Sequence, residues 1–168
     1  TAMTAMTMDH LSNGRMIIGL GVSGPQVVEG WYGAPFSKPL ARTREYIDIV
    51  RQVFAREEPV SNDGPHYPLP YIGEGAWQLG KPLKSIVHPL RKDIPIFLGA
   101  EGPKNVALAA EIADGWLPLY YSPFRQDVYA ASLANAKSDF EITQMVVAKI
   151  TDDVEAGLRP IKHMLALY

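Results

Sequence analysis

Residues Ile94–Pro118, IPIFLGAEGPKNVALAAEIADGWLP, decide the fold, because this stretch contains a strand, a turn, a helix and the start of a second strand. Ile94–Leu98 is a short apolar run that predicts a buried strand, and a turn with two glycines follows it. Pro103 fits the first turn of a helix that should extend to about Ala113. Trp116–Tyr120 is the next predicted strand. A strand, a helix and a strand in direct succession are typical of a parallel sheet.

The same alternation continues on both sides of this stretch. Met16–Val22 and Glu141–Ile150 are apolar runs with β-branched residues, and they predict two further strands. The spacing of apolar residues predicts a helix over Ala41–Arg56 and another over Pro123 to about Ala136. Four strands that alternate with helices predict an α/β fold in a single domain, residues 1–168.

Two stretches between these elements have no sustained period. Ser23–Leu40 contains three glycines and three prolines and is expected to be a loop. Residues 57–93 contain a predicted hairpin at Asn62-Asp63-Gly64, and their other glycine and proline breaks favour an insertion over one end of the fold. Near the end of the chain, Asp152 and Glu155 fit the capping box of a last helix.

Composition excludes several classes of function. A hydrophobic content of 47% and a charged content of 20% over 168 residues are those of a globular domain. The net charge of −2 gives no reason to expect nucleic acid or an anionic membrane surface as a partner. No apolar run approaches the ~20 residues that a membrane span needs. The absence of cysteine excludes disulfides and thiolate metal sites and favours a reducing cytoplasm, and the four histidines lack metal-ligand spacing, so no metal is expected.

A glycine motif lies at the end of the first predicted strand. Arg15–Gly24, RMIIGLGVSG, spells G-x-G-x-x-G, the pattern of a dinucleotide-binding turn. Such a turn requires a helix that begins directly at the glycines, whereas the next helix is expected only from about Pro39. We therefore interpret Gly19 and Gly21 as positions of close backbone approach at the carboxyl end of a strand.

The turn after Ile94–Leu98 is the better candidate for an anion site. The backbone N–H groups of Gly102, Lys104 and Asn105 are expected to be unpaired at the start of a helix, where the helix dipole favours negative charge. Asn105 adds a side-chain donor and Lys104 a positive charge. The alternative is an ordinary turn whose N–H groups meet water. Two glycines that permit close backbone approach favour phosphate binding.

Four segments occur in an order that resembles the luciferase-like monooxygenase superfamily, and within it the branch that uses the deazaflavin coenzyme F420: MTMDHLSNGRMIIGLGVSG, GWYGAPFSKPLARTREYIDIVRQVF, DGPHYPLP and IPIFLGAEGPKNVALAAEIADGWLP. The resemblance implies a partial TIM (β/α)8 barrel with about strands four to seven and an insertion after the first complete βα unit. Both ends of the sequence lie inside apolar patterns, so we expect a fragment that lacks the first three strands and the eighth. The resemblance also implies a homo-oligomer.

The same resemblance implies where a cofactor binds. The backbone of Gly21, Val22 and Ser23 is expected beside the cofactor ring. The turn after the next strand is expected to bind the phosphate-bearing tail through Gly99, Ala100, Glu101, Gly102, Asn105 and Val106. The expected cofactor is coenzyme F420, with FMN as the alternative.

The implied activity is hydride transfer between F420 and an unidentified small organic substrate. An FMN-dependent luciferase-like monooxygenase is the alternative, and a non-catalytic fragment that folds only on association is an alternative of another class. Gly24-Pro25 stands where sugar-phosphate dehydrogenases of the family have an acidic proton donor, which disfavours sugar phosphates. No catalytic residue is assigned, because the family places that residue in the absent N-terminal part.

Overall fold

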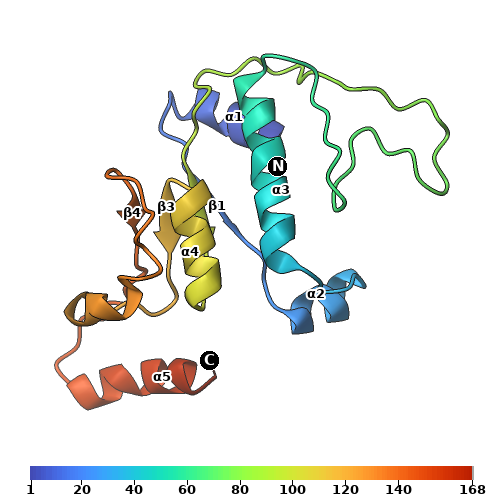
Figure 1. Cartoon of the computed structure of the whole chain (residues 1–168). Coiled ribbons are helices and arrows are strands. Elements are labelled where there is room, and N and C mark those ends of the chain that lie inside the picture. The colour runs from blue at the N-terminus through green and yellow to red at the C-terminus, as the bar shows by residue number, and fades with distance from the viewer. Residues whose placement is uncertain (168) are drawn as a thin grey trace.

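The computed structural model describes residues 1–167 and contains one parallel sheet, whose strands lie side by side in chain order (Figure 1). The strands are β1 (Ile18–Gly21), β2 (Ile96–Gly99), β3 (Gly115–Leu117) and β4 (Glu141–Ile142). The helices are α1 (Ala2–Leu11), α2 (Pro25–Tyr32), α3 (Pro39–Ala55), α4 (Pro103–Ile112), the 3-10 helix η1 (Pro123–Tyr129) and α5 (Val154–Leu167). The predicted α/β fold with a parallel sheet is confirmed.

The first three strands end level with one another. Gly21 of β1 lies opposite Gly99 of β2, and Gly99 lies opposite Leu117 of β3. Parallel strands need a crossover connection, which α3 with residues 57–93 supplies between β1 and β2, and α4 between β2 and β3. The carboxyl ends of these three strands, and the turns that follow them, therefore lie along one edge of the sheet.

One face of the sheet carries the core, because alternate residues of each strand point to the same side. Ile96, Leu98 and Trp116 on this face are at most 3% exposed. They form one buried cluster with the apolar sides of the helices, which include Ala5, Met6, Ile47, Val50, Phe54, Val106 and Ala109. Burial of this apolar surface is the main favourable contribution to folding.

The opposite face of the sheet is built differently. Its positions on β1, β2 and β3 are occupied by Gly19, Gly21, Phe97, Gly99, Gly115 and Leu117, and Glu141 is its position on β4. A Cβ atom built on Gly115 would lie 2.8 Å from three atoms of the Phe97 ring. The ring of Phe97 therefore lies across β3 at a position where no side chain stands, and Phe97 is buried there.

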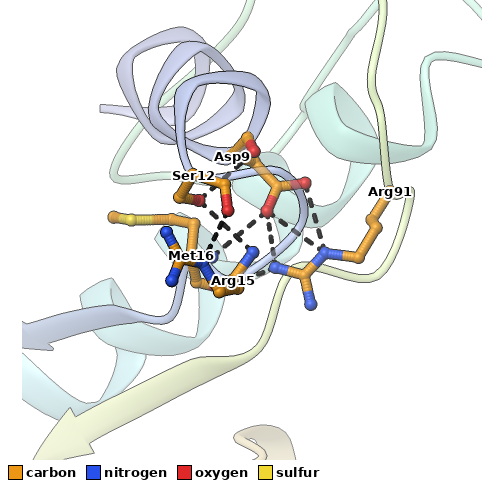
Figure 2. Close-up of polar contacts among 5 residues, drawn as sticks. All are labelled: Asp9, Ser12, Arg15, Met16 and Arg91. Atoms are coloured by element: carbon orange, nitrogen blue, oxygen red, sulfur yellow. Dashed lines mark hydrogen bonds and ion pairs between the residues drawn. The ribbon is translucent and has the colours of Figure 1, made fainter.

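A buried ion pair fixes the chain where it enters β1 (Figure 2). Asp9, at the end of α1, has no exposed surface, and its Oδ1 lies 2.6 Å from Nη2 of Arg91. Oδ1 of Asp9 also accepts a hydrogen bond from the N–H of Met16 at 3.3 Å, while Nη2 of Arg91 donates to the Met16 carbonyl at 2.6 Å. Both peptide groups of Met16 are thus held by the pair. The hydrogen bond from Arg91 is the main cause that lowers the pKa of Asp9 below its ordinary value.

Residues 57–93 leave the end of α3 and extend away from the sheet before they return to β2 (Figure 1). An antiparallel bridge between Asn62 and Leu69 forms the predicted small hairpin. Glu45 of α3 holds this hairpin, because its carboxylate accepts hydrogen bonds from Nδ2 of Asn62 at 2.7 Å and from the N–H of Tyr67 at 2.6 Å. The hairpin is thereby fixed to the middle of α3.

The prediction of a loop over Ser23–Leu40 was wrong, because this stretch contains α2. Its prolines and glycines bound the helix instead of breaking it: Pro25 occupies the first turn, and Gly33 ends the helix in a left-handed conformation with φ of 60°. A helix therefore does begin directly after the G-x-G-x-x-G motif, and the expectation that none would follow Gly24 was wrong.

Other element boundaries differ from the prediction. The first three strands are shorter than predicted, or displaced by one or two residues, and the helix over Pro123–Ala136 is a 3-10 helix that ends at Tyr129. The strand predicted over Glu141–Ile150 forms only at Glu141–Ile142, which pair with Gly115 and Trp116 of β3. The cap of α5 is Asp153, whose Oδ1 accepts the N–H of Ala156 at 3.0 Å. No helix among residues 1–167 is long and apolar enough to cross a membrane.

Candidate functional site

The carboxyl ends of β1, β2 and β3 surround a cavity of about 770 Å³. The turns after all three strands line it, which is where parallel α/β folds place their ligand sites. All residues predicted to contact a cofactor except Val106 line this cavity, namely Gly21, Val22, Ser23, Gly99, Ala100, Glu101, Gly102 and Asn105. Two strand ends about eighty residues apart in the sequence thus meet at one place. We call this space the mouth cavity.

The start of α4 forms one wall of the mouth cavity. Gly102 has a φ of 75°, a conformation that favours glycine, and the turn before Pro103 depends on it. The N–H groups of Asn105 and Val106 donate to the Gly102 carbonyl at 3.1 Å and 3.0 Å. Of the three N–H groups expected to be unpaired, that of Asn105 is therefore used inside the first turn. Those of Gly102 and Lys104 donate to no residue within 1–167.

The side chains of this turn differ in their contacts. The Asn105 amide is half-buried, lines the cavity and forms no hydrogen bond with another described residue. Val106 is 2% exposed and belongs to the core, so its contribution is to fix the first turn of α4. Glu101 accepts a hydrogen bond from the N–H of Leu119, in the segment after β3, at 2.7 Å. The wall therefore offers a free amide and two backbone donors toward the cavity.

A second cavity of about 300 Å³ adjoins the mouth cavity. The two share lining residues at the strand ends, Gly21 and Gly99, and in the first turn of α4, Asn105. The N-terminal turns of α3 and Tyr67 of the hairpin close its other side, and most of its lining is apolar. We call it the Arg42 chamber, because Arg42 is the one cationic side chain among its lining residues.

Arg42 is a positively charged group without a carboxylate partner. Its Nε and Nη2 both donate to the Tyr67 hydroxyl at 3.2 Å, and its guanidinium lies 5.3 Å from the centre of that ring. No carboxylate among residues 1–167 forms an ion pair with it, and the nearby carboxylate of Glu45 is occupied by the hairpin. A half-buried guanidinium in this setting is suited to an anionic group of a ligand.

Sequence reasoning missed Arg42, although one signal pointed to it. A positive charge in the first turn of a helix is unfavourable, because the helix dipole is positive there. Arg42 is the fourth residue of α3, which has no acidic residue in its first turn. Its place beside Tyr67 depends on the hairpin and on the packing of α3, and neither can be derived from local sequence.

The shifted pKa values lie outside the two cavities and have structural causes. Desolvation raises the pKa of Glu45, but hydrogen bonds from Tyr67 and Asn62 outweigh it and lower the pKa below its ordinary value. Desolvation also raises the pKa of Asp114, but the N–H of Ile96 and the guanidinium of Arg51 outweigh it in the same way. Neither carboxylate lines a cavity, so these shifts identify no catalytic acid or base. Within 1–167 no group of three or more His, Asp or Glu residues is placed to hold a metal ion.

Comparisons with known proteins agree with this geometry. The family model for luciferase-like monooxygenases matches residues 1–167. A Mycobacterium tuberculosis protein that carries the name of a coenzyme F420-dependent oxidoreductase is 63% identical, and the match covers 99% of this chain and 51% of that protein. The 5,10-methylenetetrahydromethanopterin reductase of Archaeoglobus fulgidus is 36% identical over 70% of this chain and 31% of its own length. The chain thus spans about half the length of the first relative and less of the second.

Two solved structures share the fold. The coenzyme F420-dependent tetrahydromethanopterin reductase of Methanopyrus kandleri has a TM-score of 0.71 at 21% identity, over 92% of this chain and 47% of that one. An F420-dependent secondary alcohol dehydrogenase, in complex with an F420-acetone adduct, has a TM-score of 0.69 at 18% identity, over 86% and 43% of the two chains. At these identities the likeness concerns the fold alone. Four successive parallel strands with intervening helices agree with the expected part of a (β/α)8 barrel.

Proposed function

The chain belongs to the luciferase-like monooxygenase family, and on that premise we propose that it forms part of the cofactor site of an oxidoreductase dependent on coenzyme F420. The activity proposed for the whole protein is hydride transfer between F420 and a small organic substrate. The observation that carries this proposal is the mouth cavity, which collects residues from the turns after β1 and β2. The names of the relatives and of the two similar structures favour F420 over FMN.

The donors around the two cavities fit a phosphate-bearing cofactor. The unpaired N–H groups of Gly102 and Lys104 and the Asn105 amide are suited to hold phosphate oxygens at the start of α4. Arg42 supplies positive charge in the adjoining chamber, which Asn105 also lines.

The strand ends fit a flat ring. A Cβ atom built on Gly21 or Gly99 would meet its neighbours only at 3.6 Å or more, which is ordinary contact. Packing within the chain therefore does not require glycine at either position. Glycine instead leaves the backbone open to a ligand that approaches closely. When bound, F420 supplies the hydride carrier, while Gly21, Val22 and Ser23 orient its ring and keep water from one side.

Titration of the full chain with F420 and, separately, with FMN tests the proposal. Binding quenches the cofactor fluorescence, and F420 is expected to bind more tightly than FMN. Tight binding of FMN with none of F420 would favour the FMN-dependent monooxygenase and overturn the choice of cofactor. Absence of binding to both would favour the non-catalytic alternative for this chain.

The variant Arg42→Ala tests the proposed phosphate contact. Loss of a charged hydrogen-bond donor is expected to weaken F420 binding by about tenfold or more. Tyr67→Phe removes the same intramolecular hydrogen bonds but keeps the charge, so its affinity should stay near that of the unmodified chain. Lys84→Ala is the control for a positive charge that lines neither cavity. Equal losses in Arg42→Ala and Tyr67→Phe would contradict a phosphate contact.

A further inference from the structure

Two side chains hold the segment that follows β3 from opposite sides. The N–H of Leu119 donates to Oε1 of Glu101, in the turn after β2, at 2.7 Å. The carbonyl of Leu119 accepts a hydrogen bond from Nε2 of Gln144, just after β4, at 3.2 Å. Oε1 of Gln144 in turn accepts the N–H of Tyr121 at 3.0 Å. The ends of three neighbouring strands are therefore joined through a single peptide segment.

This segment has little else to fix it. It follows a strand of three residues and lies outside any helix or strand, and the hydroxyl of Tyr129 donates to the Tyr120 carbonyl at 3.0 Å. Farther along it, the Tyr121 ring packs against Trp116 and Tyr129, whereas Pro118 and Leu119 have no such ring contact within residues 1–167. Leu117, Pro118 and Leu119 nevertheless form a wall of the mouth cavity. The bonds made by Glu101 and Gln144 at Leu119 therefore help to set the width of the cavity on this side.

The negative charge of Glu101 has a separate effect. Its hydrogen bond to Leu119 needs only an acceptor oxygen, which a glutamine also supplies, as a weaker neutral acceptor. Within residues 1–167 the carboxylate forms no ion pair, and it lies in the turn that presents the free N–H groups of Gly102 and Lys104. A negative charge in the same turn repels an anion bound to these N–H groups, and the repulsion is stronger at low salt than at high salt.

We propose that Glu101 and Gln144 are positioning residues that set the third wall of the mouth cavity, and that the charge of Glu101 weakens binding of a phosphate-bearing cofactor there. The positioning role, which is the first half of the proposal, follows from the hydrogen bonds that join the segments after β2, β3 and β4. The second half rests on the proposed function, because it requires the phosphate of the cofactor to lie at the start of α4. The two halves are therefore tested with different measurements.

The first measurement is hydrogen–deuterium exchange of the full chain without cofactor, followed by mass spectrometry of peptides that contain Leu119 and Tyr121. Glu101→Ala and Gln144→Ala should speed exchange in this segment by about tenfold, the size expected for one lost net hydrogen bond. Glu101→Gln should speed exchange much less than Glu101→Ala, because its amide oxygen still accepts the bond, and Glu58→Ala is the control for loss of an exposed carboxylate elsewhere. Unchanged exchange in Glu101→Ala, or equal acceleration in Glu101→Gln, would overturn the positioning role.

The second measurement is the dissociation constant for F420 in the unmodified chain, Glu101→Gln and Glu101→Ala, at low and high salt. Glu101→Gln should bind about two- to fivefold more tightly at low salt, and the ratio should approach one near 1 M salt. Glu101→Ala should bind more weakly than Glu101→Gln, because it lacks the bond to Leu119. Weaker binding by Glu101→Gln, or a ratio that does not change with salt, contradicts the charge effect. If the unmodified chain does not bind F420, the proposed function and the charge effect both fail, and exchange alone decides the positioning role.

Discussion

A carboxylate with no exposed surface is stable only where hydrogen bonds and an opposite charge replace the water it has lost, and Asp9 is such a case. Arg91 reaches it from the end of residues 57–93, with Nε at 3.1 Å and 3.2 Å from its two oxygens. The pair also fixes the peptide groups of Met16 at the entrance to β1. At the scale of single residues, this pair is the contact whose loss should matter most for folding.

Asp9→Ala should destabilise the chain by about 3 kcal/mol, the lower end of the range for a broken buried ion pair, because the Arg91 side chain is 31% exposed and can reach water. Urea denaturation followed by circular dichroism measures the change. Arg44→Ala breaks the exposed pair with Glu111 and serves as the control, with little effect on the midpoint. A midpoint for Asp9→Ala as high as that of the control would show that the pair does not stabilise the fold.

The Asp9–Arg91 pair should also make the free energy of unfolding depend on pH. Because the hydrogen bond from Arg91 lowers the folded-state pKa of Asp9, its stabilisation is complete above the unfolded-state pKa near 3.8. It is lost as the pH falls through the lower folded-state value. The difference in unfolding free energy between the unmodified chain and Asp9→Asn should therefore shrink below about pH 4. Glu45, Glu111 and Asp114, whose pKa values are also lowered, titrate in both proteins and cancel in this difference. A difference that stays constant to low pH would contradict this assignment.

At the scale of elements, the pairing of β2 with β3 depends on the absence of a side chain at Gly115. The ring of Phe97 occupies the place where a Cβ atom would stand. A methyl group there would push the ring from its position or separate the two strands, and a well-packed site has little room for either.

Gly115→Ala should cost about 1–3 kcal/mol of unfolding free energy, the usual range for an overpacked site. Phe97→Leu in the same chain should recover part of the loss, because the smaller side chain leaves room for the methyl group. A double-mutant cycle measured by thermal or urea unfolding gives the coupling between the two positions. Additive effects of the two substitutions would mean that the ring and the methyl group do not collide.

The elements also show what local sequence can and cannot predict. Ile94–Pro118 was predicted closely because strand, turn and helix signals all lie within a few residues of one another. The residues of the mouth cavity could be assigned because parallel strands bring their carboxyl ends together. Local sequence does not predict α2, because proline and glycine usually interrupt regular structure. Here Pro25 begins the helix and Gly33 ends it. The Asp9–Arg91 pair and the place of Arg42 beside Tyr67 depend on contacts between distant segments, which local sequence does not encode.

At the scale of the whole molecule, the segment that follows β4 leaves the sheet soon after this short strand ends. Both residues of β4 pair with β3, and the N–H of Thr143 donates to the Trp116 carbonyl at 2.9 Å, but residues 144–150 form no strand. Several apolar side chains of this part and of α5 are exposed, among them Met145, Val146, Val147, Ile150, Val154 and Leu158. An apolar edge of this kind favours association with another chain.

The 168-residue chain is therefore expected to associate in solution. Size-exclusion chromatography and sedimentation should give an apparent mass that rises with concentration. Val146→Lys places a charge on the edge segment and should reduce the association. Ile72→Lys changes an exposed apolar residue of the 57–93 segment and is the matched control. A monodisperse monomer with a cooperative thermal transition would contradict the expectation.

Contacts near both ends of residues 57–93 hold this segment to the rest of the fold. A change of its length between those contacts is therefore not expected to move the strands of the sheet. Glu45 holds its hairpin, Arg56 donates to the Ser85 carbonyl at 2.8 Å, and Arg91 is fixed to Asp9. Between these anchors, Tyr71 and Gln78 donate hydrogen bonds only within the segment. The part of the segment between the hairpin and Ser85 is therefore a suitable insertion site for protein engineering. It can be shortened or replaced by a foreign sequence while α3, β1 and the strand ends keep their positions.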